Sequence, residues 1–150
     1  MIRSQVRKTA IATVTAKSWD EAHYDAPDGQ PALAQAEFGL SYAGDLVGES
    51  TTQLLLAYTG GDPNAPKTLV GDYVGLERIT GTLDGRTGSF VVEQRGRHEG
   101  GVARTKGRIV PDSATGELVG LQGEIEADAG DLTYQVTLSY AFEPDPAVHA

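Results

Sequence analysis

Alternation of apolar and polar residues with a period of two, interrupted by glycine-rich turns, runs along most of the chain. Residues 71–93 show it most clearly, because two alternating runs flank Asp84-Gly85, a dipeptide that favours a tight β-hairpin turn. The 19 glycines would interrupt helices, but they suit the turns and bends of a small curved sheet. The sequence therefore predicts an all-β protein with little or no helix.

Eight runs are predicted as strands. They span residues 6–17, 32–43, 46–59, 69–82, 87–98, 102–110, 120–127 and 131–143. Residues 18–31 are predicted as an irregular extension followed by a loop, and residues 60–67 as a loop, because prolines and glycines cluster there. We expect both faces of the third strand to be at least half buried near its end.

The connections leave no room for crossover helices, so strands that follow one another are expected to pair antiparallel. A closed eight-stranded antiparallel barrel, the architecture of the lipocalins, would remove the exposed sheet edges. A sandwich of two sheets is the alternative.

Length and charge restrict the class of protein. The 150 residues fit one domain, 1–150, with an ordered core of about residues 6–143 and a flexible C-terminal tail, 144–150. A net charge of −9 argues against nucleic acid as a partner, because phosphate backbones are bound by clustered basic residues. No signal peptide or membrane-spanning apolar stretch is recognised, so we expect a cytoplasmic protein without a membrane partner.

Metal and cofactor sites are not predicted. The absence of cysteine excludes disulfides and thiolate ligands. The three histidines, His23, His98 and His149, are scattered and match no metal-binding spacing. A basic stripe, Arg104, Lys106 and Arg108, is interpreted as a solvated strand face paired with acidic neighbours.

Glu77, in the middle of the strand predicted at 69–82, is the exception to the apolar pattern. If its side chain points into a barrel, loss of solvation raises its pKa and makes it a candidate general acid or base. Arg78 should then point to the opposite face. The alternative is that Glu77 faces solvent or is fixed by a structural hydrogen bond to Arg, Tyr or backbone.

Several motifs together resemble an uncharacterised bacterial family, a domain of unknown function. They are Lys17–Glu21, Tyr42–Glu49, Leu56–Tyr58, Tyr73–Arg78, Gly81–Phe90 and Thr115–Leu121. The resemblance covers residues 9–142 and implies an allene-oxide-cyclase-like barrel that self-associates into a homo-oligomer. It implies no established reaction. Where the family pattern often has an acidic residue and a histidine, this chain has Gln53 and Gln94, whereas Glu77 matches.

A binding function is therefore favoured over an enzyme. The barrel interior is expected to hold a small apolar or amphipathic ligand, with tyrosines as walls and polar groups that orient one end. The candidate ligand-binding residues are Gln53, Glu77, Gln94, Tyr42, Tyr58 and Tyr73. Most of the aromatic residues are interpreted as core or subunit interface. The alternative function is a cofactor-independent isomerase or cyclase that uses Glu77, or a hydrolase that uses carboxylates such as Glu77, Glu49 and Glu93. A third option is an oligomeric scaffold with a solid interior.

Overall fold

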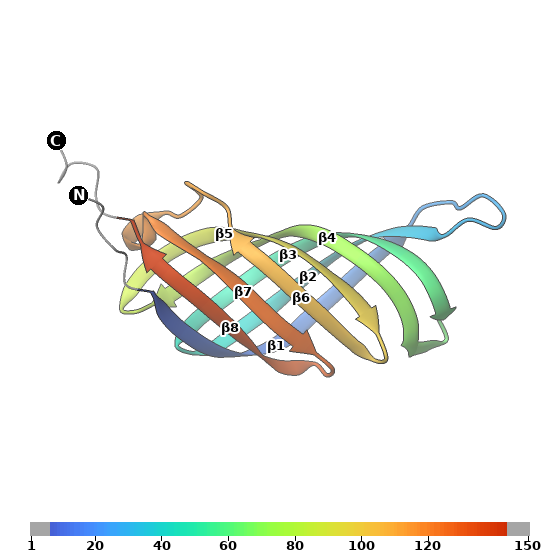
Figure 1. Cartoon of the computed structure of the whole chain (residues 1–150), viewed down its shortest axis with the longest axis horizontal. Coiled ribbons are helices and arrows are strands. Elements are labelled where there is room, and N and C mark those ends of the chain that lie inside the picture. The colour runs from blue at the N-terminus through green and yellow to red at the C-terminus, as the bar shows by residue number, and fades with distance from the viewer. Residues whose placement is uncertain (1–6, 144–150) are drawn as a thin grey trace.

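The computed structural model describes residues 7–143, which form eight strands and one short 3-10 helix (Figure 1). The elements are β1 (Lys8–His23), β2 (Ala32–Gly44), β3 (Leu46–Asp62), β4 (Ala65–Leu83), β5 (Arg86–Glu99), β6 (Val102–Ile109), η1 (Gly116–Leu118), β7 (Leu121–Ala129) and β8 (Thr133–Phe142). The predicted all-β class and its eight strands are confirmed. The predicted flexible tail, 144–150, lies outside the described residues. No helix within residues 7–143 has the length and apolar character needed to cross a membrane.

Each strand pairs antiparallel with its neighbours in the chain, and β1 also pairs with β8. The sheet therefore closes on itself as one hydrogen-bonded ring instead of forming two separate sheets. Alternate side chains point into this ring, as the strand period requires.

The Asp84-Gly85 hairpin is confirmed between β4 and β5. Asp84 has φ 54° and Gly85 has φ 73°. Positive φ at both central residues defines the type I′ turn, whose twist matches that of the flanking strands. This turn sets the β4–β5 register, in which Glu77 lies opposite Val92.

Two predicted loops are shorter than expected. Residues 18–23 continue β1 after a bulge, and β3 and β4 extend to Asp62 and from Ala65, so that only residues 63–64 separate them. Hairpin partners supply the backbone hydrogen bonds that the irregular composition of these segments did not suggest. The expectation that both faces of β3 are buried near its end is wrong for Leu55, which is 55% exposed on the outer face.

The ring has one closed end and one open end. At the closed end η1 packs against β5, where the Thr87 and Ser89 amides donate hydrogen bonds to Glu117 and Thr115. Below η1 lies a solid apolar core made by Ile79, Leu83, Phe90, Val92 and Leu118, each at most 2% exposed. The interior is therefore filled at this end, and space for an interior cavity is left toward the opposite end, where the β1–β2 loop projects (Figure 1).

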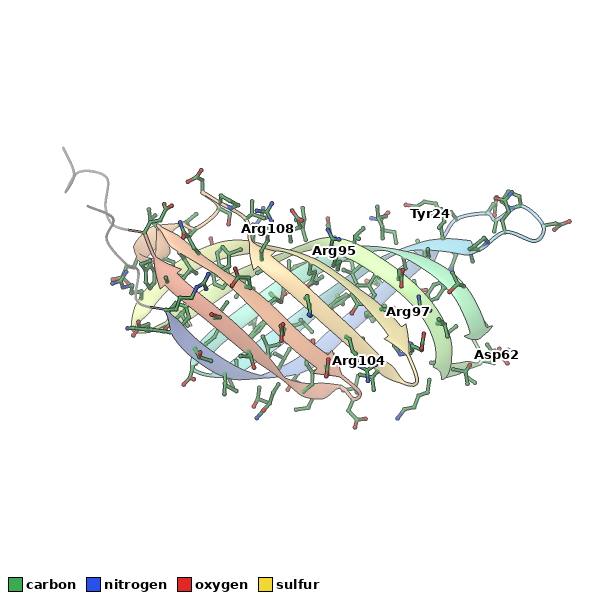
Figure 2. The ribbon with its side chains drawn as sticks, in the orientation of Figure 1. Tyr24, Asp62, Arg95, Arg97, Arg104 and Arg108 are labelled. Carbon is green, nitrogen blue, oxygen red and sulfur yellow. The ribbon has the colours of Figure 1, made fainter. Side chains whose placement is uncertain are left out.

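The outer face carries charged pairs. Lys106 and Arg108 on β6 pair with Glu126 and Glu93 on the strands either side, and Arg104 lies opposite Asp128. Figure 2 shows Arg104 and Arg108 projecting away from the ring. The interpretation of this stripe as a solvated face is confirmed. Such exposed pairs contribute little to stability, about 0–1 kcal/mol each.

Candidate functional site

A cavity of about 790 Å³ occupies the open half of the ring. All eight strands contribute to its lining, which is mainly apolar and includes Leu40, Leu54, Leu56, Ile125, Ala127 and Val136. The strand ends at its mouth include Ala32, His98, Ala103 and Ala129, which confirms that it opens opposite η1. The volume and the apolar lining are those of a pocket for a small organic molecule.

Glu77 lies at the inner part of this cavity, where it is 1% exposed. The Tyr42 hydroxyl (2.5 Å) and the Ser50 hydroxyl (2.6 Å) both donate hydrogen bonds to its Oε2 atom. Burial raises the pKa of Glu77, and the two hydrogen bonds oppose that rise because they favour the ionised form. The pKa of Tyr42 is raised as well, first by burial and then by the Glu77 charge. The arrangement fixes one carboxyl oxygen and leaves the other available.

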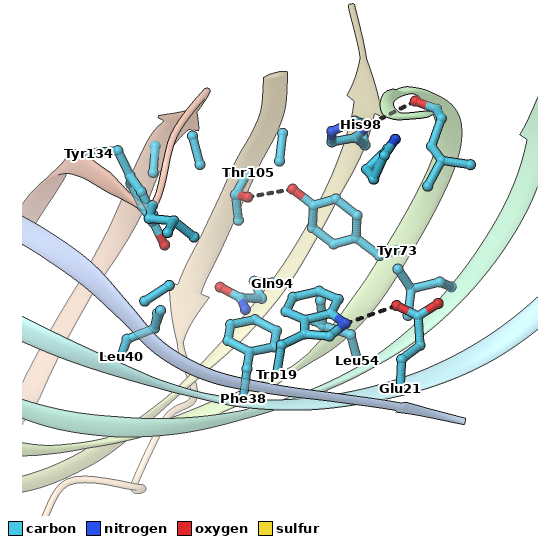
Figure 3. A pocket seen from close by; sticks show the side chains of 18 of the residues that line it. Trp19, Glu21, Phe38, Leu40, Leu54, Tyr73, Gln94, His98, Thr105 and Tyr134 are labelled. Carbon is cyan, nitrogen blue, oxygen red and sulfur yellow. Dashed lines mark hydrogen bonds between the residues drawn. The ribbon is translucent and has the colours of Figure 1, made fainter. Parts of the chain in front are cut away.

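Gln94 and Tyr73 come from the neighbouring strand pair, β4 and β5. The Gln94 side chain is 8% exposed and lines the cavity. The Tyr73 hydroxyl shares a 2.5 Å hydrogen bond with the Thr105 hydroxyl, which holds the phenol ring along the cavity wall (Figure 3). Tyr73 therefore contributes an apolar ring to the wall, while the Gln94 amide stays free to bind a ligand.

A second polar group of side chains lies at the mouth and is centred on Glu21. Its carboxylate accepts hydrogen bonds from Trp19 Nε1 (3.0 Å) and the Tyr58 hydroxyl (2.8 Å), and it lies 2.9 Å from His23 Nε2. The Trp19 ring stacks on Phe38 with their centroids 4.7 Å apart (Figure 3). Burial and the contact with Glu21 raise the pKa of Tyr58, so its hydroxyl stays protonated as a donor. These contacts hold the mouth in one arrangement.

A bulge in β1 brings this mouth group inside. Ala16 pairs with Leu40 and Ser18 with Gly39, so Lys17 is one extra residue in β1. Before the bulge the even-numbered residues point inward, and after it the odd-numbered residues do, because one inserted residue reverses the faces of a strand. The bulge thus turns the side chains of residues 19, 21 and 23 toward the cavity.

Five of the six predicted ligand-binding residues line this one cavity. They are Tyr42, Tyr58, Tyr73, Glu77 and Gln94. Gln53 does not line it, because this residue is exposed on the outer face of β3, opposite Leu76. Positions 53 and 58 are an odd number of residues apart in one strand, so they cannot share a face. Whether the five residues bind a ligand stays a prediction.

The interpretations of Glu77 are resolved in part. Its side chain points inward, the first of the two interpretations, and Arg78 is exposed on the other face, as expected for that case. The alternative of a structural hydrogen bond also holds, since Tyr42 donates one. Glu49 and Glu93, named as further carboxylates of a hydrolase, are exposed and pair with Lys17 and Arg108, so they do not accompany Glu77 in the cavity.

Of the mouth group, only Tyr58 was predicted to bind a ligand. Trp19, Glu21 and His23 alternate with small or polar residues, and this short period-two signal was available in a segment predicted to be irregular. His98 and Tyr134 also line the cavity but were not among the predicted ligand-binding residues. The ring nitrogen Nδ1 of His98 lies 2.7 Å from the Leu69 carbonyl oxygen, which orients the imidazole (Figure 3). Within residues 7–143 no three His, Asp or Glu side chains gather in a way that could hold a metal ion.

Comparison with known proteins gives a family but no activity. The family model described as "Protein of unknown function (DUF3224)" matches residues 10–140. A crystal structure of a DUF3224 protein of unknown function from Shewanella oneidensis MR-1 superimposes with a TM-score of 0.68 and 25% sequence identity, covering 94% of this chain and 100% of that one. A search of curated proteins finds no match. The resemblance to an uncharacterised family is thereby confirmed: this chain belongs to the DUF3224 family of proteins of unknown function.

Proposed function

We propose that the ring is a ligand-binding barrel of the allene-oxide-cyclase or lipocalin kind and that it holds a small apolar or amphipathic molecule. The observation that carries this proposal is the cavity of about 790 Å³, open at one end and lined mainly by apolar side chains. Burial of a ligand's apolar surface there yields about 25 cal/mol per Å² before the costs of association are subtracted. A few polar groups, including Glu77 and Gln94, would orient one end.

A fluorescence titration with N-phenyl-1-naphthylamine, an uncharged apolar fluorophore, tests this proposal. Wild-type protein should bind the dye, with emission rising as the dye leaves water. Ala127→Phe fills the cavity with a new ring and should weaken binding by about tenfold or more, since Ala127 lines it. Asp128→Phe adds the same ring to the outer face and is the matched control. Equal affinity in all three proteins would refute the cavity as the binding site.

A cofactor-independent enzyme, an isomerase, cyclase or hydrolase, is the second candidate function. The observation that favours it is the buried carboxyl of Glu77, because burial raises its pKa and a carboxyl group with a raised pKa is a candidate general acid or base. The Tyr42 contact holds this carboxyl in one orientation. If a turnover is found, Glu77→Gln should reduce kcat by at least about a hundredfold. Retained turnover in that variant would exclude Glu77 as the acid or base.

Self-association is proposed through an apolar patch on the outer face, with a second copy of the chain as the occupant. Four side chains, each 50–55% exposed, form this outer patch: Leu33, Leu55, Val74 and Leu76. Leu55 lies directly opposite Val74. On the adjacent strand Arg95 and Glu93 lie next to the patch, so a two-fold axis through it can place opposite charges of two copies together. A cytoplasmic location, and the lack of nucleic acid and membrane partners, remain predictions from the sequence.

A further inference from the structure

Three polar groups face the cavity without a partner from the protein. The Oε1 atom of Glu77, the side-chain amide of Gln94 and the hydroxyl of Tyr134 make no hydrogen bond within residues 7–143. In the same part of the chain, Thr52 Oγ1 is the one unpartnered polar side-chain atom that is fully enclosed. The other three groups therefore keep surface open to the cavity, although the Glu77 and Gln94 side chains are only 1% and 8% exposed.

These groups converge on the same region. Gln94 lies opposite Gly75, two residues before Glu77 on the inward face of β4, so Gln94 and Glu77 are diagonal neighbours across the β4–β5 pair. Tyr134 approaches from β8, where it lies opposite Val14 of β1. Tyr134 and Glu77 both line the same cavity, and the Glu77 charge contributes, after burial, to raising the pKa of Tyr134. Together they present a carboxyl, an amide and a phenol to whatever enters.

A buried polar group without a partner costs free energy, so the ligand is expected to supply the missing hydrogen bonds. The Gln94 amide both donates and accepts, as does the Tyr134 hydroxyl, and the Glu77 carboxylate accepts. A matching ligand group must therefore donate as well as accept. A carboxylate only accepts, and an ammonium only donates.

We propose that the ligand enters with a neutral hydroxyl group, an alcohol or a phenol, and that Glu77, Gln94 and Tyr134 select this group over carboxylates and ammonium ions. This inference rests on the ligand-binding function proposed above and names the class of its ligand.

A hydroxyl group fits Glu77 in both protonation states. The ionised Oε1 atom accepts a hydrogen bond from the ligand hydroxyl. Because Oε2 already accepts two hydrogen bonds, a proton on Glu77 would sit on Oε1, which then donates to the hydroxyl oxygen. A ligand carboxylate would instead lie beside the ionised Glu77 in a site shielded from water, where like charges repel strongly. Burying an ammonium would leave the donors of Gln94 and Tyr134 unpaired.

The test is isothermal titration of wild-type protein at pH 7.5 with 1-decanol, decanoate, decylammonium and decyl methyl ether. These four probes share one alkyl chain and differ in the end group. Decanol should bind at least about tenfold more tightly than each of the other three. Glu77→Gln removes the carboxylate charge and should raise the affinity for decanoate by about tenfold. Gln94→Leu should weaken decanol by about tenfold while leaving the ether within twofold.

The outcomes separate this inference from the function on which it rests. Equal affinity for the four probes, or tighter binding of decanoate or decylammonium, would overturn the hydroxyl inference and leave a ligand-binding cavity. If none of the four probes binds while N-phenyl-1-naphthylamine does, the hydroxyl inference is likewise overturned and the ligand-binding cavity stands. If the dye does not bind either, the hydroxyl inference and the ligand-binding function are both overturned. The order of the four affinities is measured on wild-type protein and needs no variant. If Gln94→Leu does not fold, Gln94→Met replaces it.

Discussion

Glu77 is a buried carboxyl group whose protonation couples folding to pH. Its carboxyl is buried, and burial raises its pKa above the ordinary value of 4.5. At a pH between 4.5 and the raised pKa of the folded state, Glu77 is protonated in the folded protein but ionised in the unfolded chain. The free energy of unfolding therefore falls as pH rises through that window, with a limiting slope of about 1.4 kcal/mol per pH unit.

Glu77→Gln should remove this pH dependence. The free energy of unfolding is measured with urea at several pH values from 4 to 9. As pH rises above 4.5, the wild-type value should decline relative to that of the variant. Glu49→Gln is the control, since Lys17 lowers the pKa of the exposed Glu49 and its contribution has the opposite sign. Parallel curves for wild type and Glu77→Gln would mean that Glu77 titrates normally.

The short 3-10 helix η1 buries a single side chain at the closed end of the ring. Leu118 is fully buried, while the next residue, Val119, is 66% exposed. Leu118→Ala should lower the free energy of unfolding by about 2–5 kcal/mol, because it removes buried methyl groups and leaves a cavity. Val119→Ala should change it by less than about 0.5 kcal/mol. Thermal or urea unfolding measures both, and a similar small effect of the two changes would show that η1 does not close the core.

Strand parity explains how much the sequence could predict about the elements and the site. Period-two alternation made an inward Glu77 one of two open interpretations, and Asp84-Gly85 predicted the turn beside it. Applied to β3, the same rule argues against the predicted ligand-binding role of Gln53, which shares a face with Leu55 and not with Tyr58. The bulge at Lys17 could not be predicted, because a bulge depends on the partner strand and reverses the faces without a local signal. Trp19, Glu21 and His23 were therefore missed: their alternation lies in a segment predicted to be irregular, and their inward direction follows only from the bulge.

At the scale of the whole molecule, the feature least predictable from the sequence was whether the interior is filled or hollow. Whether eight strands enclose a solid core or a hollow depends on how side chains of different size meet across the ring. Here Phe90 and Leu118 fill one end, whereas alanines and glycines such as Ala103, Ala129 and Gly60 leave the other end open. No local pattern in the sequence specifies that division.

The proposed self-association through the outer patch is also a property of the whole molecule. Leu55→Lys places a charge in the centre of the outer patch and should shift the protein to a smaller oligomer. Val47→Lys is the matched control, because Val47 is equally exposed (55%) on the same strand but lies away from the patch, opposite Thr82. Light scattering during size-exclusion chromatography measures the mass. A monomeric wild type, or an equal response to both changes, would contradict the proposed interface.

The most direct test of the binding cavity is a crystal soaked with 10-bromo-1-decanol and measured at the bromine absorption edge. Bromine marks one end of this molecule and the hydroxyl group marks the other. We expect the anomalous peak of bromine inside the mouth near Trp19 and Tyr58, with the alkyl chain leading inward and the hydroxyl at Glu77. A bromine peak on the outer face, or beside Glu77 with the hydroxyl directed to the mouth, would contradict it.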